Sequence, residues 1–252
     1  VGFGDCFCLR DRKKSLLVDF GTNNSRIEGR PRREIFDVII SDLSTIKSKN
    51  LLLTHFHMDH LSGLLYMMKK KDISVDFGKI YLPDVFSKKE MSRTLVLLLL
   101  ADLLKESGLP SRQVSLFALV DALLENKQNV ELLSRGKLFE NKYQALWPDT
   151  DVIRKETDEV YNRICEDGKF KEVMDVLLEF AEKLRLIVWS MTAEGNKPAE
   201  TVEKETDLTA SELTEQPEVR QKIIRAYVYE REFRRIKALP DFKKLLAWLN
   251  EN

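Results

Sequence analysis

All three histidines of the chain lie in one short segment, Thr54-His55-Phe56-His57-Met58-Asp59-His60. With its aspartate, the segment has the pattern H-x-H-x-D-H. Imidazole nitrogens and carboxylate oxygens are the usual protein ligands of zinc and similar metals. Four such groups in so short a turn suggest two adjacent ions. We expect His55 and His57 to face the first ion, and Asp59 and His60 to face the second.

The residues around the histidine segment strengthen this prediction. The apolar run Leu51-Leu52-Leu53 before it reads as a buried strand, and Leu61-Ser62-Gly63-Leu64 after it opens a helical pattern. A strand, a ligand-rich turn and a helix are a plausible frame for a metal site. The alternative is a polar loop with chance histidines, because short motifs produce false matches.

The first 150 residues alternate between strand and helix patterns. Apolar residues recur at helical spacing between residues 34 and 47, and the pattern after the histidines predicts a helix over residues 60–70. The further elements that we expect are strands at 5–10, 15–20, 79–83, 130–133 and 143–147, and helices at 86–107 and 111–126. This alternation predicts an α/β layered domain.

The composition changes after Pro148. Residues 151–252 are rich in charge and carry apolar residues at helical spacing, with a polar stretch at 193–206 and helix patterns at 221–236 and 241–249. A helix start is also plausible at 206–212. We therefore divide the chain into an α/β region, residues 1–150, and a charged, mainly helical insertion or extension, residues 151–252.

The overall charge and hydropathy exclude some classes of protein. The chain has 252 residues, 41 basic and 41 acidic, so no net charge draws it to nucleic acid or to an anionic membrane. The apolar run at residues 95–101 is too short to cross a bilayer, and we expect no membrane partner. Cys6, Cys8 and Cys165 form no disulfide framework, and we expect buried, reduced thiols in a cytoplasmic protein.

The histidine segment resembles the signature of the metallo-β-lactamase-fold hydrolases. Further stretches agree with that resemblance: 16–21 resembles the second strand of these proteins, and 79–83 the strand after the motif helix. The opening Val1-Gly2-Phe3-Gly4-Asp5 and the stretch Ala145-Leu146-Trp147-Pro148 resemble the branch that includes the ComEC-type competence hydrolases. The resemblance covers residues 1 to 150.

The resemblance implies a fold and a chemistry. The fold would be part of an αββα sandwich, with a helical insertion or extension. The family's later ligands, two histidines and a bridging aspartate, have no counterpart after His60, so we expect an incomplete domain. A complete domain would hold two zinc ions, with iron or manganese as alternatives, and would use a metal-activated water. Asp59 would also orient that nucleophile, and Asp19 would steady the metal loop, although a polar residue at a strand end is an equal interpretation.

The substrate follows only by analogy with the family. The competence-type stretches favour a phosphodiester or a nucleic acid, and a small molecule is also open. Two other classes of function remain: a non-catalytic metal-binding or regulatory module with a degenerate or truncated site, and an oxidoreductase that uses iron. The sequence does not indicate an oligomeric state.

The polar loop at residues 21–33 is the remaining candidate for a functional segment. It contains Arg26, Arg30, Arg32 and Arg33, and in a hydrolase it would lie near the metal and grip a phosphate. A solvated loop before a helix is the more ordinary interpretation, because charged surface loops are common.

Overall fold

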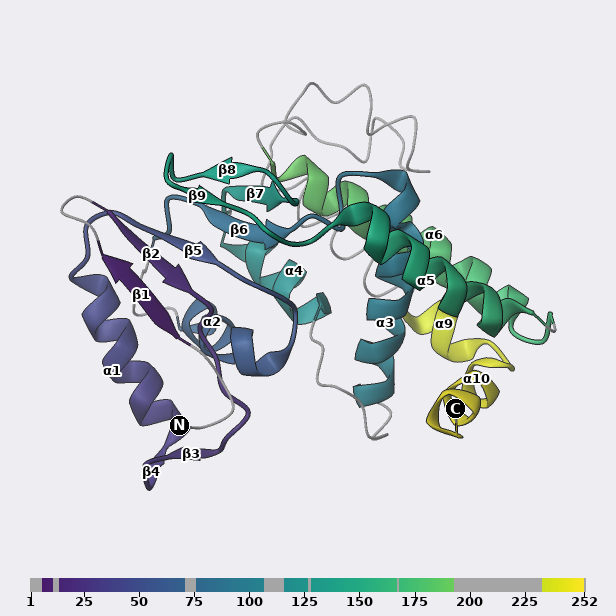
Figure 1. Cartoon of the computed structure of the whole chain (residues 1–252). Coiled ribbons are helices and arrows are strands. Elements are labelled where there is room, and N and C mark those ends of the chain that lie inside the picture. The colour runs from purple at the N-terminus through teal and green to yellow at the C-terminus, as the bar shows by residue number, and fades with distance from the viewer. Residues whose placement is uncertain are drawn as a thin grey trace, which may run out of the picture. The chain divides into compact units, whose positions relative to one another are not determined.

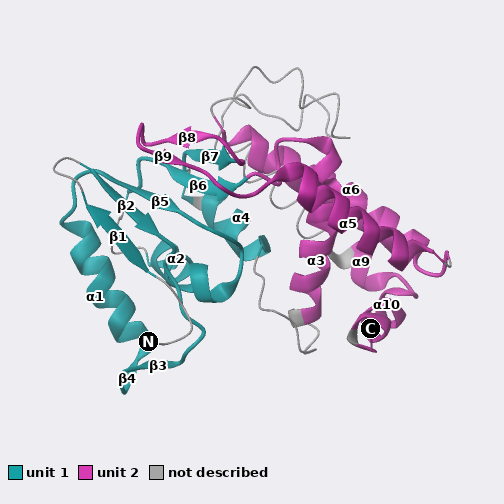
Figure 2. Cartoon of the chain, viewed as in Figure 1, with its two compact units in different colours: residues 1–83, 112–133 teal, residues 84–111, 134–252 magenta. Residues whose placement is uncertain are grey.

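A computed structural model describes residues 6–10, 14–70, 76–106, 116–126, 128–166, 168–192 and 233–251. The chain forms two compact units, residues 1–83 with 112–133 (unit 1) and residues 84–111 with 134–252 (unit 2) (Figure 2). Several predictions lie outside the described residues: the opening stretch 1–5, the turn at 11–13, the helix start at 111–115, the loop at 193–206, the helix start at 206–212 and most of the helix at 221–236. The predicted boundary at residue 150 stays a prediction.

Unit 1 is built on a five-stranded sheet in the order β1-β2-β5-β6-β7 (Figure 1). Its strands are β1 (Phe7–Arg10), β2 (Ser15–Val18), β5 (Lys49–Leu52), β6 (Ile80–Pro83) and β7 (Val130–Leu133). β1 pairs with β2 antiparallel, whereas β2, β5, β6 and β7 pair parallel. The carboxyl ends of these four strands therefore meet at one edge of the sheet, where α/β proteins commonly place their sites.

Three helices of unit 1 follow the parallel strands: α1 (Arg32–Ser44), α2 (Met58–Lys69) and α4 (Leu116–Glu125). α1 contacts α2, and α2 contacts α4. The apolar spacing read from the sequence explains the packing of α1, which buries Phe36, Ile40 and Leu43. In β5, Lys49 and Leu51 are buried while Asn50 and Leu52 are half-buried, so the two faces of this strand differ in burial.

The polar loop after β2 contains a small hairpin that the sequence did not predict. β3 (Arg26–Ile27) pairs antiparallel with β4 (Arg30–Pro31), and α1 begins directly afterwards. Gly29 in its turn has φ of 78°, a conformation that glycine adopts without steric cost.

The described residues of unit 2 are mainly helical. This unit contains η1 (Lys89–Met91), α3 (Ser92–Glu106), α5 (Thr150–Cys165), α6 (Lys171–Ser190), α9 (Phe233–Ala238) and α10 (Phe242–Glu251), with a hairpin of β8 (Leu138–Phe139) and β9 (Tyr143–Gln144). α3 contacts both α5 and α6. Leu95, Leu99 and Phe180 are fully buried, so the apolar run at residues 95–101 is a core helix.

The structure confirms the α/β class and corrects one expectation. Cys6 and Cys8 are exposed, not buried. Cys8 lies on β1, an edge strand of the sheet whose four residues are all exposed, and Cys6 directly precedes this strand. Among the residues described, no helix is long and apolar enough to cross a membrane.

Candidate metal centre

The histidine segment forms the connection between β5 and α2, at the carboxyl edge of the parallel strands. Leu53 and Phe56 are buried and fix the loop to the core. The half-buried His55 and His57 flank Phe56 in sequence. The alternation of apolar and histidine residues therefore lets the loop bury its apolar members and keep its imidazoles accessible.

The start of α2 supplies the rest of the segment. His57 occupies the N-cap position with extended backbone and makes no side-chain capping hydrogen bond. Asp59 lies in the first turn, where a carboxylate interacts favourably with the helix dipole.

Three of the predicted ligands come together. One ligand atom from each of His55, His57 and Asp59 lies within 4.8 Å of the other two. The imidazole rings of His55 and His57 are 4.7 Å apart between centroids and nearly perpendicular. Two imidazoles and a carboxylate, converging and half-buried, fit a zinc-like ion as a donor set.

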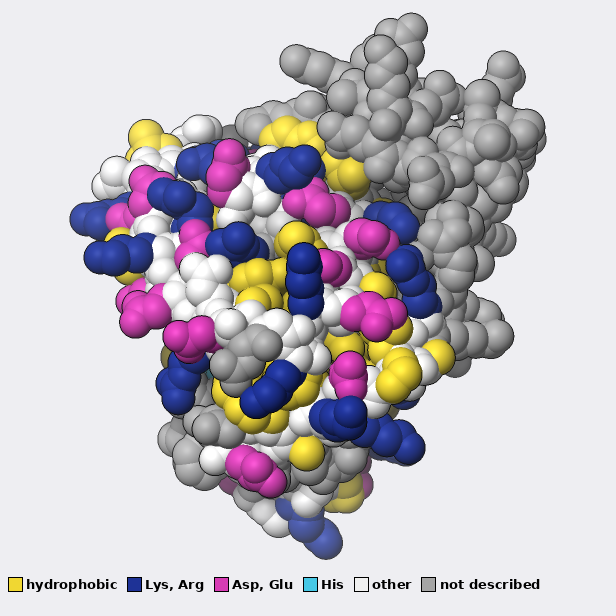
Figure 3. Space-filling view, turned by 90° about the vertical axis from the view of Figure 1, so that its right-hand side faces the viewer, with side chains coloured by type: hydrophobic (Ala, Val, Ile, Leu, Met, Phe, Trp, Pro, Cys, Tyr) yellow, Lys and Arg dark blue, Asp and Glu magenta, His cyan; other side chains and the backbone are white. Residues whose placement is uncertain are grey.

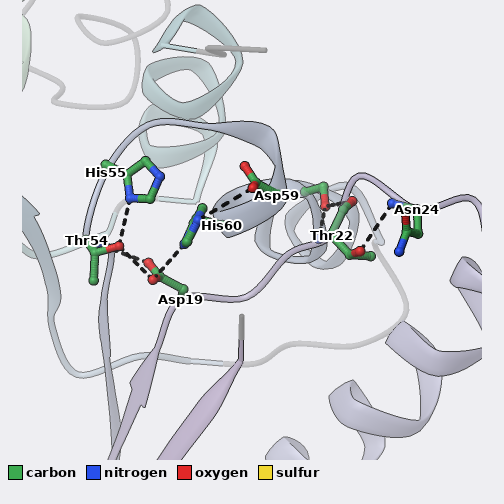
Figure 4. A network of polar contacts seen from close by, with 8 residues as sticks. Asp19, Thr22, Asn24, Thr54, His55, Asp59 and His60 are labelled. Carbon is green, nitrogen blue, oxygen red and sulfur yellow. Dashed lines mark hydrogen bonds and ion pairs between the residues drawn. The ribbon is translucent and has the colours of Figure 1, made fainter. Parts of the chain in front are cut away.

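Asp19 and Thr54 orient His55 (Figure 4). The Thr54 amide donates to Asp19 Oδ1 at 2.8 Å, and the Thr54 hydroxyl donates to Asp19 Oδ2 at 2.7 Å. The same hydroxyl lies 2.9 Å from His55 Nδ1. Because a hydroxyl has one proton and Thr54 gives it to Asp19, we assign the proton between Thr54 and His55 to Nδ1. This tautomer leaves His55 Nε2 as the nitrogen available to a metal.

Asp19 orients His60 in the same way. His60 Nδ1 lies 2.9 Å from Asp19 Oδ2, and a carboxylate only accepts, so Nδ1 carries the proton. His60 Nε2 lies 3.7 Å from Asp59 Oδ2. A carboxylate that holds the far nitrogen of a ligating histidine is a recurring feature of metal sites, because it fixes the ring and raises its basicity.

The backbone around Asp19 explains how one residue reaches two parts of the loop. Asp19 is 2% exposed and has φ of 55°, a left-handed conformation that aspartate tolerates better than most residues. Its amide donates to Leu52 O at 2.8 Å, which joins the end of β2 to β5. The Phe20 amide donates to His60 O at 2.7 Å, which joins the same turn to α2.

Two glycines permit this close approach. A Cβ on Gly21 would lie 2.6 Å from the Leu61 amide nitrogen and 2.7 Å from Asp59 O, both backbone atoms. A Cβ on Gly63 would lie 2.6 Å from the ring of Phe20. The turn after β2 and the first turn of α2 therefore pack backbone against backbone directly beside the candidate ligands.

The electrostatic environment favours neutral His55. Burial lowers the pKa of His55 below its usual value of 6.5, and the nearby His60 and His57 lower it further. A neutral imidazole is the form that ligates a metal.

All four candidate metal ligands predicted from the sequence lie in the described part of the chain. His55, His57 and Asp59 form one group, and His60 lies between Asp19 and Asp59. The predicted division into two pairs of ligands stays a prediction. Sequence reasoning did not single out Thr54, and its position just before the first histidine was the available signal.

Comparison with known proteins agrees with this geometry. Residues 1–76 match the model of the metallo-beta-lactamase superfamily, and the mixed α/β sheet of unit 1 is consistent with that fold. The chain is 32% identical over 77 residues to the endoribonuclease YSH1 of Mycosarcoma maydis. The match spans 31% of this chain and 8% of that protein. No solved structure gives a significant match.

The comparisons support the superfamily for this part of the chain and do not support the competence-type branch. Of the two stretches that suggested that branch, residues 1–5 lie outside the described residues, and residues 145–148 lie beyond the matched range.

Proposed function

We propose that this chain carries the metal-binding part of a hydrolase that cleaves phosphodiester bonds in nucleic acid. The observation that carries the proposal is the convergence of His55, His57 and Asp59 at the end of a parallel strand. The superfamily match supports metal-dependent hydrolysis, and the endoribonuclease relative supports a phosphodiester substrate.

His55, His57 and Asp59 would hold the first ion, and zinc suits two imidazoles and a carboxylate best. His60, whose Nε2 lies 3.7 Å from Asp59 Oδ2, would be a ligand of a second ion. A bound metal supplies Lewis acidity and a nucleophilic hydroxide at neutral pH. The remaining work falls to the protein: Asp59 orients the attacking water, and Asp19 keeps a proton on Nδ1 of His60.

A non-catalytic metal-binding module is the second candidate. The whole chain contains three histidines, all between residues 55 and 60, and the described residues contain one group of three potential ligands. A single ion held by three protein ligands would suit such a module.

We also propose a cytoplasmic location, because all three cysteines are free.

Metal content and turnover test the proposal together. The purified chain is offered zinc, iron or manganese, and bound metal is measured by elemental analysis beside His57→Ala. Asp42→Asn, at an exposed position of α1, is the control. We expect stoichiometric zinc in the wild type and the control, little in His57→Ala, and metal-dependent cleavage of bis(p-nitrophenyl) phosphate and single-stranded RNA.

The outcomes separate the two candidates. Tight metal without turnover on either substrate would favour the binding module. Metal content equal to that of His57→Ala would exclude both candidates for this chain.

A further inference from the structure

A cluster of arginines spans the loop after β2 and the first turn of α1, in a chain whose net charge is zero. Arg26, Arg30, Arg32 and Arg33 fall within eight residues, accompanied by two acidic residues, Glu28 and Glu34. Three of the arginines are exposed and Arg32 is half-buried. We refer to residues 26–33, which include the β3–β4 hairpin, as the basic arm.

The basic arm is tied to the helix that carries the candidate ligands. Arg32 Nη1 donates to Thr22 O at 3.1 Å, and the Arg32 amide donates to Ser25 O at 2.9 Å. Thr22 in turn exchanges two hydrogen bonds of 2.9 Å with the Ser62 hydroxyl, on α2. Ser62 lies three residues after Asp59, about one helical turn.

This connection is short and closely packed. The Asn24 amide donates to the Thr22 hydroxyl at 3.2 Å, which holds the next residues of the connection (Figure 4). The tight backbone contact at Gly21 fixes the first residues of the connection. The segment that leads into the basic arm therefore lies beside the first turn of α2, the turn that carries two of the candidate metal ligands.

The arginines of the arm differ in what they already bind. Arg32 serves as the anchor, and its guanidinium also lies 5.9 Å from the centre of the Phe36 ring. Arg26 Nε donates to Gly29 O within the hairpin. Arg30 makes a loose, exposed ion pair with Glu34 at 3.6 Å. Such exposed pairs contribute little, so Arg30 can exchange this partner for a phosphate at small cost.

We propose that the basic arm binds the phosphodiester backbone of a single-stranded nucleic acid whose chain continues to the metal loop. The inference rests on the proposed function, because a phosphodiester substrate is what gives the arm its ligand. Guanidinium groups donate two parallel hydrogen bonds to phosphate oxygens, which lysine does not match. Basic residues outnumber acidic ones in the basic arm, whereas basic and acidic side chains are mixed on the face drawn in Figure 3.

The experiment measures binding without catalysis. Fluorescence anisotropy follows a labelled single-stranded RNA of mixed sequence, and a DNA of the same sequence, in the presence of EDTA at several salt concentrations. The test variant is Arg30→Gln/Arg33→Gln, at two exposed positions. The matched control, Lys155→Gln/Arg163→Gln, removes two exposed charges from α5. Thermal unfolding checks that both variants are folded.

The expected effect follows from counterion release. Each phosphate contact with a single strand contributes a slope of about 0.7 in log affinity against log salt. Losing two contacts should lower the slope by about 1.4 and weaken binding roughly 25-fold at 0.1 M salt. The control should stay within about twofold. Arg30→Lys/Arg33→Lys should keep most of the slope, because it keeps the charge.

Equal loss in both polymers, or a larger loss in RNA, supports the proposal. Unchanged affinity in the test variant, or an equal loss in the α5 control, overturns it. Because EDTA prevents metal-dependent hydrolysis, the two proposals fail separately. Arm-dependent binding by a protein that never cleaves RNA counts against the hydrolase, and cleavage without arm-dependent binding counts against the arm.

Discussion

Replacing Asp19 by asparagine tests whether this residue orients the histidines of the metal loop or only stabilises the fold. Asparagine has nearly the same shape and also tolerates the left-handed backbone at this position, where φ is 55°. Its single oxygen can keep the hydrogen bond from the Thr54 amide. Its NH₂ group then faces the Thr54 hydroxyl and His60 Nδ1, both of which donate to the native carboxylate.

The two displaced donors respond differently. The Thr54 hydroxyl can rotate and accept, but His60 must move its proton from Nδ1 to Nε2 to accept from asparagine. That tautomer has no lone pair on the nitrogen that faces Asp59. A hydrogen bond to a charged group contributes about 1.5–3 kcal/mol, so we expect a loss of roughly 2–3 kcal/mol in unfolding free energy. Metal affinity should fall about 10- to 100-fold, as for other residues that hold a ligating histidine.

Competition for zinc against a chromophoric chelator measures the affinity, and urea unfolding measures the stability. Asp37→Asn is the control, because Asp37 also accepts from a hydroxyl and a cation in unit 1, those of Tyr66 and Lys70. It should leave zinc affinity unchanged. If Asp19→Asn binds zinc within twofold of the wild type but unfolds more easily, Asp19 only stabilises the fold, and the tautomer argument is wrong.

Three further predictions concern the frame around the site. Gly21→Ala should cost about 1–3 kcal/mol by urea unfolding, because the new Cβ meets backbone atoms of α2; a loss below 0.5 kcal/mol would show that the turn relaxes freely. Phe180→Ala, at a fully buried position in unit 2, should cost about 3–5 kcal/mol in the same assay, and a change below 1 kcal/mol would contradict its core position. Asp149 caps α5 and pairs with Arg135, which holds the pKa of its carboxyl below the usual 3.8. Its charge therefore stabilises the fold above pH 3.8 and ceases to do so as the pH falls through the lowered value, so the difference in melting temperature between wild type and Asp149→Asn should vanish in strong acid. A difference that persists there would refute this assignment.

Sequence patterns predicted much of unit 1 because its elements follow simple periodicities. The amphipathic spacing in residues 34–47 anticipated α1 to within a few residues, and the apolar run before the histidines anticipated β5. The β3–β4 hairpin was missed because its strands are two residues long and carry arginines and a proline, which give no strand signal. The exposure of Cys6 and Cys8 was missed because edge position depends on strand order, which local sequence does not encode.

The candidate site was predictable in composition and less so in arrangement. Residue types and spacing nominated His55, His57, Asp59 and His60 without any structure. The role open to Asp19 depends on the pairing of β2 with β5, since Asp19 and Thr54 are 35 residues apart in the chain. The strand pairing brings the Asp19 carboxylate within hydrogen-bond distance of both Thr54 and His60.

The bonds of Asp19 also make the site sensitive to strand register. Val18 lies opposite Leu52 in the parallel pairing of β2 with β5, and Asp19 follows directly. A slip of one residue would turn the side chains of β2 to the opposite face of the sheet and carry the carboxylate away from the loop. An ion bound by the oriented histidines would therefore stabilise the native register of β2 and β5 relative to shifted registers. Metal binding would in this way select the correct strand pairing as the sheet forms.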